Sequence, residues 1–244
     1  AEAVAAVCAS HDGDGFLRVT LTAGPGPLGS NRGDLEPTLV VAVRPGAVRT
    51  DPTDVLLVPW TRNERGPLAG VKSTSYGDNV VALVAAADVG AGEALFANTR
   101  DELCEGTGSN VFVGFGKRLV TPPLDSGCLA GVTRELVLEA GIGEEAVVPM
   151  SSLADASEMF LVSTGREVQP VRHVISPDGR RHELPWCSGP FTVEARRVWL
   201  IDKPYAPPGR GRQPQPWELV QRANLTYVGQ TRSLDTLNVI PYAG

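Results

Sequence analysis

Lys72 has the surroundings in this sequence that best suit covalent chemistry. It follows the turn-forming segment 66–70, Gly-Pro-Leu-Ala-Gly, and apolar Val71, and it precedes a cluster of serine and threonine. A lysine amine in a partly desolvated site can form a Schiff base with a carbonyl group. A solvated loop lysine could have the same neighbours, so this segment alone leaves both interpretations open.

Glu105 is the candidate acidic partner. It stands in the segment 104–110, Cys-Glu-Gly-Thr-Gly-Ser-Asn, immediately before a run of alternating valine and phenylalanine. A Gly/Ser-rich turn follows it and leads into a predicted strand. A carboxylate there could accept a hydrogen bond from a protonated ring nitrogen of a cofactor and keep that ring an electron sink. The alternative is a glutamate exposed on the turn.

Two segments could bind an anion such as a phosphate. Gly131-Val132-Thr133 opens a predicted helix, where free N–H groups and a hydroxyl make an anion site. Thr133 could instead only cap that helix. Ser163-Thr164-Gly165 follows a predicted strand, and its hydroxyls also suit a phosphate, although the same residues form ordinary turns.

These residues lie in or between elements that the apolar patterns predict. The predicted strands are 16–22, 38–43, 55–60, 93–98, 110–113, 118–121 and 158–163, and the predicted helices are 79–87, 132–140, 151–156 and 192–199. Beyond about residue 200 the chain is rich in proline, glycine and arginine. We expect an extended or disordered segment there.

The composition limits the classes of function. The 244 residues carry a net charge of −6, which argues against binding to a phosphate backbone, so we expect no nucleic-acid partner. No run of about 18 apolar residues predicts a membrane span. The four cysteines contain no Cys-x-x-Cys pair, and with three histidines they show no zinc-ligand spacing. We therefore expect no metal and a reduced, cytoplasmic protein.

The order of the chemical segments resembles the class IV aminotransferase family, the fold-type IV pyridoxal-phosphate enzymes. A lysine is followed by a glutamate before a Gly/Ser-rich turn, then by Gly-Val-Thr at a helix start, then by Ser-Thr-Gly after a strand. The matching segments are 70–76, 93–98, 105–112, 121–134 and 162–171, and the resemblance as a whole covers roughly residues 16 to 198.

The resemblance implies an α/β (α+β) fold, that of the fold-type IV large domain with a partial small N-terminal domain. It places the C-terminal part of the small domain at 1–50 and the cofactor-binding large domain at 51–199. The segment 200–244 does not match the family and is expected to be a tail of unassigned structure.

The resemblance also implies a role for each candidate residue. Lys72 would hold pyridoxal 5′-phosphate through a Schiff base and move protons, Glu105 would pair with the pyridine nitrogen, and Tyr76 would lie near the ring. The residues implied to bind the phosphate are Val132 and Thr133 on one side and Ser163 and Thr164 on the other.

Residues 62–73 and 121–133 look most like those of bacterial aminodeoxychorismate lyases. Such lyases convert 4-amino-4-deoxychorismate to pyruvate and 4-aminobenzoate, a folate precursor, which implies a small-molecule amine substrate and a ring proton removed by Lys72. Branched-chain and D-amino-acid aminotransferases share the cofactor residues, so an aminotransferase is the alternative.

A second alternative is a truncated relative with impaired catalysis. In the family's layout the first part of the small domain, with a phosphate-binding arginine, would precede the start of this chain. Relatives act as homodimers, so we expect a homodimer.

Overall fold

The computed structural model describes residues 2–28 and 36–201, which divide into two compact units, one ending at Ala47 and one beginning at Val48. The first unit holds helix α1 (Glu2–Ala9) and an antiparallel hairpin of β1 (Gly15–Thr22) and β2 (Thr38–Pro45). Leucine and β-branched residues, which favour extended backbone, dominate the middle of both strands.

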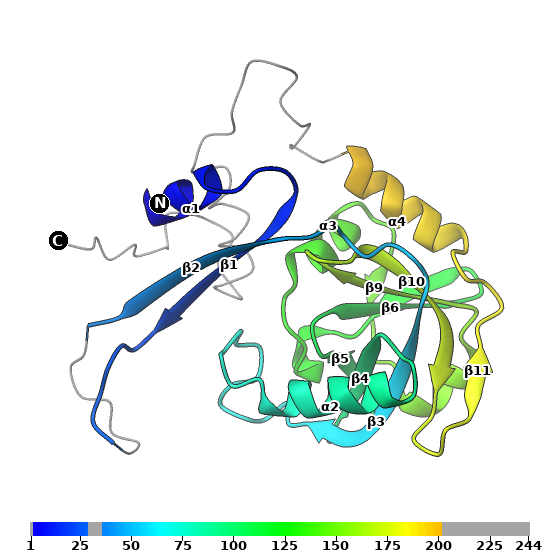
Figure 1. Cartoon of the computed structure of the whole chain (residues 1–244). Helices are drawn as coiled ribbons and strands as arrows, with labels where there is room; N and C mark the ends of the chain where they lie inside the picture. The colour runs from blue at the N-terminus through cyan, green and yellow to red at the C-terminus, as the bar shows by residue number, and fades with distance from the viewer. Residues whose placement is uncertain (1, 29–35, 202–244) are drawn as a thin grey trace. The chain divides into compact units, whose positions relative to one another are not determined.

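The second unit is a curled mixed sheet with helices packed against it (Figure 1). Its elements in chain order are β3 (Thr53–Arg62), α2 (Gly77–Asp88), β4 (Glu93–Asn98), β5 (Leu103–Gly106), β6 (Asn110–Phe115), β7 (Arg118–Thr121), η1 (Leu124–Ser126), α3 (Val132–Glu139), β8 (Glu144–Glu145), η2 (Met150–Asp155), β9 (Glu158–Ser163), β10 (Glu167–Ile175), β11 (Arg181–Glu183) and α4 (Pro190–Ile201).

Strand β10 joins the two halves of this sheet. The strand order is β5-β4-β3-β10-β9-β6-β7-β8, with β11 beside β10. β10 runs parallel to β3 on one side and antiparallel to β9 on the other. The halves carry different parts of the candidate chemistry, because β3 leads to Lys72 and β9 leads to Ser163 and Thr164.

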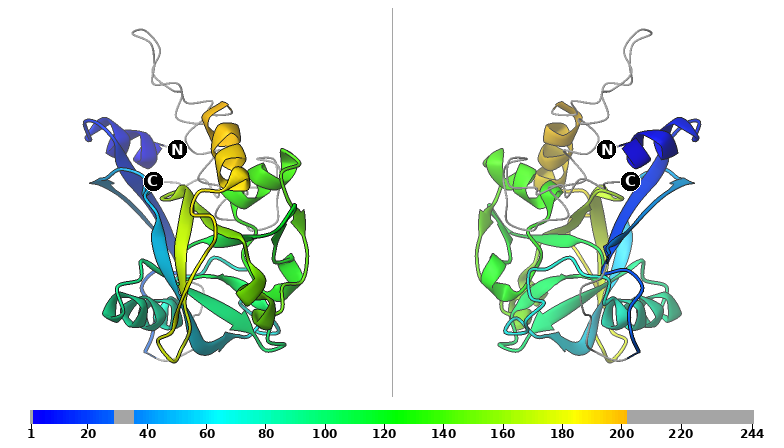
Figure 2. Two further views of the ribbon diagram at one scale, coloured as in Figure 1. Left: turned by 90° about the vertical axis from the view of Figure 1, so that its right-hand side faces the viewer. Right: turned by 90° about the vertical axis from the view of Figure 1, so that its left-hand side faces the viewer.

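Apolar side chains fill the space inside the curl and under the helices. Valine, leucine and methionine side chains from β3 to β7, β9 and β10 form the central cluster. α2 covers β3 and β4 through alanines, while α3 and α4 cover the β6–β9 region. The views in Figure 2 agree with Figure 1 that α2 and α4 lie at opposite ends of this unit. None of the helices within the described ranges has the length and apolarity needed to cross a membrane.

Most predicted elements are present, and three of them, 93–98, 118–121 and 158–163, have the predicted ends. Four strands were not predicted, namely β5, β8, β10 and β11. No strand was expected at β5, which carries Glu105, and Pro170 and charged residues interrupt the apolar pattern of β10. The predicted helix at 151–156 is the 3₁₀ helix η2. The predicted tail begins in the last residues of α4 and otherwise lies outside the described residues.

Candidate active site

Lys72 lies in the loop that joins β3 to α2. Its side chain is exposed, and its Nζ atom donates a hydrogen bond to the Tyr76 hydroxyl at 3.2 Å. Gly70, two residues earlier, has φ +71°, a backbone conformation that favours glycine. Of the two interpretations that the sequence leaves open, the described protein shows the solvated loop lysine. Tyr76, which is expected near the cofactor ring, lies beside this amine.

Glu105 lies in β5, so the alternative of a glutamate exposed on a turn is wrong. It is 7% exposed and stands opposite Phe96 of β4. Its Oε2 atom accepts a hydrogen bond from the backbone N–H of Leu129 at 2.9 Å, and its Oε1 atom lies 3.6 Å from Nη2 of Arg62. A buried carboxylate of this kind needs such partners, because burial removes its hydration.

Burial raises the pKa of Glu105 to about 7, and it outweighs three effects in the opposite direction. The Leu129 N–H, the Arg62 guanidinium and the Lys72 ammonium each lower this pKa. The charge of Lys72 therefore acts on Glu105, although one group lies in a loop and the other in the sheet. A carboxyl group with this pKa exchanges its proton near neutral pH.

Arg62 is a functional candidate that the sequence analysis missed. Its guanidinium carbon lies 4.4 Å from the centre of the Phe96 ring, and its Nη1 donates to Asn79 at 2.9 Å. Asn79 in turn donates to the Thr107 carbonyl at 2.6 Å. The Nε and Nη2 atoms of Arg62 are buried and make no hydrogen bond within the described residues. Arg62 therefore places a positive charge beside Glu105, and two of its nitrogen atoms have N–H groups without a hydrogen-bond acceptor within the described residues.

The turn that follows Glu105 is fixed from inside by Glu93. This carboxylate is fully buried and accepts hydrogen bonds from the backbone N–H (3.1 Å) and hydroxyl of Thr107 and from the Ser109 hydroxyl (2.9 Å). It also pairs with Nη2 of Arg166 at 3.1 Å. A Cβ atom at Gly106 would stand 2.5 Å from the Ser109 hydroxyl, so only glycine fits this turn as it stands.

No side chain caps the start of α3, where Thr133 is buried and Val132 half-buried. Gly131 occupies the N-cap position and makes no side-chain cap, so the interpretation of Thr133 as the cap is wrong. The first N–H groups of a helix have no carbonyl one turn earlier to bind. Leu129, just before this helix, donates to Glu105 and accepts from Asn110 Nδ2 at 2.8 Å. Val132 and Thr133 therefore follow directly on the segment that contacts Glu105.

Ser163 and Thr164 lie at the turn between β9 and β10. Asn110 is paired with Val162 in the β6–β9 register, which brings the end of β9 beside the start of β6. Ser163 is half-buried and Thr164 is exposed. Arg166 follows in the same turn and reaches Glu93, so this turn and the one after Glu105 share one buried ion pair. α3 packs on β9, which places the two predicted anion-binding segments on neighbouring elements.

The donors and acceptors gathered here fit pyridoxal phosphate. The Lys72 amine suits the aldehyde of this cofactor, and the Tyr76 phenol suits its ring hydroxyl. The buried Glu105 carboxyl suits the pyridine nitrogen, and the uncapped start of α3 suits the phosphate. No group of histidine, cysteine, aspartate or glutamate in the described ranges could hold a metal ion.

Comparisons with known proteins place the chain in a family. Residues 1–174 match the family described as amino-transferase class IV. The chain is 30% identical over 176 residues to the Methanocaldococcus jannaschii protein named "Putative branched-chain-amino-acid aminotransferase", and the match covers 68% of this chain and 60% of that protein.

Two solved structures share the fold. The branched-chain amino acid aminotransferase of Thermobaculum terrenum in its PLP form has a TM-score of 0.71 and 30% identity, over 81% of this chain and 67% of that one. A Legionella pneumophila protein, "Putative 4-amino-4-deoxychorismate lyase", has a TM-score of 0.72 and 22% identity, over 81% of this chain and 73% of that one, and so supports the fold alone. The predicted fold class is confirmed, and the chain belongs to the class IV aminotransferase family of pyridoxal-phosphate-dependent enzymes.

Proposed function

We propose that the chain binds pyridoxal phosphate through Lys72 and acts on the amino group of a small-molecule substrate. The observation that supports this best is the hydrogen bond from Leu129 to Glu105, because it ties the buried acid to the segment that opens α3. The carboxyl for a ring nitrogen and the helix start for a phosphate thereby belong to one continuous piece of structure, and Lys72 acts electrostatically on the same acid.

Each residue of the chain has a distinct task under this proposal. Pyridoxal phosphate supplies an aldehyde for the amine and an electron-accepting ring. Lys72 would hold the cofactor through its aldehyde and would accept a substrate proton as a general base. The Tyr76 hydroxyl, 3.2 Å from that amine, orients it. Glu105 pairs with the ring nitrogen. Val132, Thr133, Ser163 and Thr164 bind the phosphate.

Two reactions are compatible with these tasks. The first is amino transfer on a branched-chain or other amino acid, which is supported by relatives at about 30% identity that carry that name. The second is the lyase reaction on 4-amino-4-deoxychorismate, which is supported by the resemblance of the sequence of residues 62–73 to such lyases. The matched part of the chain covers 60% of the Methanocaldococcus jannaschii relative's length, so the activity of the whole chain is part of the proposal.

One experiment separates the reactions and tests Lys72 at the same time. The purified chain with added pyridoxal phosphate is supplied with L- and D-amino acids, and conversion of the cofactor to pyridoxamine phosphate is followed by absorbance. Parallel samples receive 4-amino-4-deoxychorismate, and release of 4-aminobenzoate is followed by fluorescence. Lys72→Ala should abolish whichever signal appears, while Lys117→Ala, an exposed lysine of the β6–β7 turn, should retain it. A Lys72→Ala variant with full activity would overturn the proposal.

A further inference from the structure

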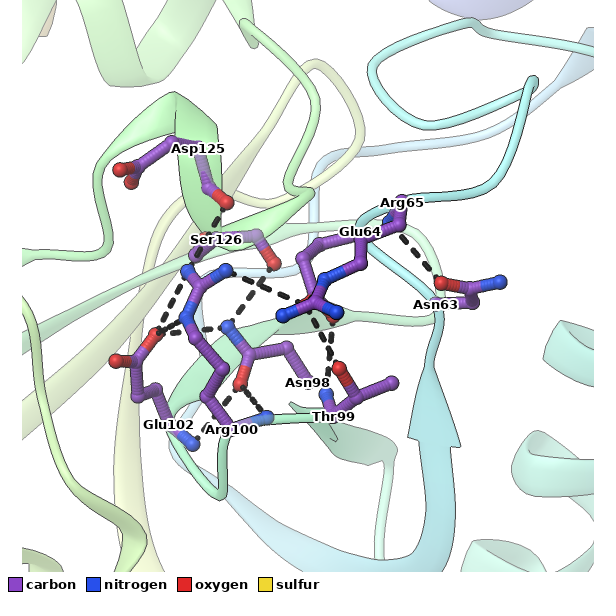
Figure 3. Close-up of polar contacts among 9 residues, drawn as sticks. All are labelled: Asn63, Glu64, Arg65, Asn98, Thr99, Arg100, Glu102, Asp125 and Ser126. Carbon is purple, nitrogen blue, oxygen red and sulfur yellow. Dashed lines mark hydrogen bonds and ion pairs between the residues drawn. The ribbon is translucent and has the colours of Figure 1, made fainter.

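Glu64 begins the loop that carries Lys72, and its carboxylate is almost completely enclosed. The side chain is 2% exposed. It accepts hydrogen bonds from the backbone N–H of Thr99 at 3.0 Å and from the Thr99 hydroxyl at 2.7 Å, and Arg100 Nη1 lies at 3.3 Å (Figure 3). The loop is thus attached to the turn between β4 and β5, which lies 35 residues further along the chain.

That turn has its own internal order. The Asn98 side-chain oxygen accepts from the backbone N–H of Arg100 at 2.9 Å and of Glu102 at 3.1 Å. Arg100 Nε donates to Glu102 at 2.9 Å. The turn therefore presents the Thr99 donors and the Arg100 guanidinium as a preformed receptor for a carboxylate, which limits the ordering that Glu64 must impose.

A third segment, residues 123–131, meets the same cluster (Figure 3). Arg100 Nη2 donates to the Asp125 carbonyl at 3.1 Å, and Asn98 Nδ2 donates to the Ser126 carbonyl at 3.4 Å. Gly127 has φ +94°, and a Cβ atom there would stand 2.8 Å from Cβ of Glu64. The two backbones approach so closely that no side chain fits between them.

This third segment continues to the residues of the candidate site. Two residues after Gly127, Leu129 donates its N–H to Glu105. The Glu64 cluster therefore connects the loop of Lys72 to the segment that contacts Glu105 and opens α3. Glu64 lies eight positions before Lys72 in the sequence, and no described contact joins their side chains.

The ionisation of Glu64 supports this connection. The Thr99 hydroxyl and N–H bonds, followed by the Arg100 charge, lower the pKa of Glu64 to about 2. The carboxylate is therefore charged at every pH at which such enzymes act, and its hydrogen bonds are charge-assisted.

We infer that Glu64 is a positioning residue, which fixes the loop of Lys72 against the segment 123–131 and so sets the place of the amine relative to Glu105. The inference rests on the proposed function of Lys72. It assigns Glu64 no contact with substrate or cofactor.

The test compares Glu64→Gln with a matched control. Glu144→Gln removes a carboxylate from an ion pair with Arg118 at the β7–β8 edge. Thr99→Val is a milder third variant, because it removes the hydroxyl donor and keeps the backbone donor.

The first measurement is hydrogen exchange of the segment 63–76 in the protein without cofactor. Here Gly66, Ala69 and Val71 form turn hydrogen bonds. In Glu64→Gln these amides should exchange on the order of tenfold faster than in the unaltered protein, which is the ratio expected for loss of a charged hydrogen-bond partner. Thr99→Val should act in the same direction with a smaller ratio, and it keeps the test decisive if Glu64→Gln does not fold.

The second measurement is the rate at which pyridoxal phosphate becomes attached to Lys72, trapped by borohydride and located by mass spectrometry. Glu64→Gln should slow attachment about as much as it speeds loop exchange, while Glu144→Gln should change neither by more than about twofold. Unchanged loop exchange in both Glu64→Gln and Thr99→Val would overturn the inference, as would equal acceleration over the whole second unit. Failure to trap Lys72 in the unaltered protein would instead refute its proposed function and leave the loop measurement to decide on Glu64.

Discussion

The acid and the lysine of the candidate site are held in different ways. Glu105 and Glu93 lie on the antiparallel neighbours β5 and β4, are 7% and 0% exposed, and accept backbone N–H groups from the segments around them. Lys72 is exposed in a loop, where its described hydrogen bond goes to Tyr76. The loop is attached to the body at Glu64 and again at the start of α2.

Because the acid is buried and the lysine is exposed, substitutions at the two residues should affect different properties of the protein. Removing a partner from a buried charged group costs several kcal/mol, because the group that remains has lost its hydration and has no replacement. Contacts near the surface contribute little to unfolding free energy, yet they can decide where a reactive amine lies. Changes at the acid side should therefore register in stability, and changes at the lysine side in cofactor chemistry.

The largest expected effect is at the buried pair of Glu93 and Arg166. Glu93→Gln leaves the Arg166 guanidinium buried without its anion. We expect a loss of about 3–5 kcal/mol in the free energy of unfolding, measured with urea. Glu144→Gln, at an exposed ion pair, should change it by less than about 0.5 kcal/mol. Equal effects of the two substitutions would remove the contrast between the regions.

Glu105 should make stability depend on pH. Its pKa is about 7 when folded and 4.5 in the reference state, so below pH 4.5 both states hold the proton. As the pH rises from 4.5 to 7, the unfolded chain loses this proton while the folded chain keeps it. Stability without cofactor should therefore fall by about 3 kcal/mol over this window. Glu105→Gln should remove this fall and Glu139→Gln, an exposed change, should retain it. If stability still falls with pH in Glu105→Gln, the fall is caused by other titrating groups.

Gly131→Ala tests the close approach at the start of α3. A Cβ atom there would stand 2.0 Å from Asn110 Oδ1, so Asn110 must move and its bond to Leu129 must weaken. We expect a loss of about 1–3 kcal/mol in unfolding free energy and weaker binding of pyridoxal phosphate. Gly108→Ala is the matched control, because nothing lies within 4 Å of a Cβ atom at that position. A neutral Gly131→Ala would show that this segment adjusts freely.

The smallest effect on stability is expected at Tyr76. Tyr76→Phe removes the hydroxyl that accepts from Lys72 in an exposed loop, so the free energy of unfolding should change by less than about 0.5 kcal/mol. The rate of attachment of pyridoxal phosphate to Lys72 should nevertheless change severalfold, because the amine loses its orienting partner. A substantial loss of stability without a change in attachment would reverse the proposed contrast.

The sequence alone predicts the elements whose apolar patterns are strong. β4 and β9 consist of short apolar runs and were predicted with the ends they have. β5 is four residues long and carries Glu105, so nothing local indicates a buried strand. β10 contains Pro170, Arg172 and His173 and is stabilised by three neighbouring strands that no local pattern shows.

The same reasoning applies to the candidate site. Lys72, Glu105 and Thr133 could be selected because their segments occur in a known order. Arg62 and Glu64 could not, because the groups that they contact lie far away in sequence, from Asn79, 17 residues after Arg62, to Glu105, 43 residues after it. The sequence also could not decide between a solvated and a partly desolvated Lys72, since the exposure of this side chain depends on where the loop lies.

The pairing of β3 with β10 has a consequence for how this protein reaches its folded state. Asp54 at the start of β3 contacts Arg172 of β10, 118 residues later in the chain. β4 can pair with β3 early, but the other edge of β3 stays uncovered until β10 has left the ribosome. Such non-local pairing slows folding and exposes an unpaired strand edge in the meantime. The loop that contains Lys72 continues directly from β3, so it follows a strand whose second edge is covered only after β10 has been added.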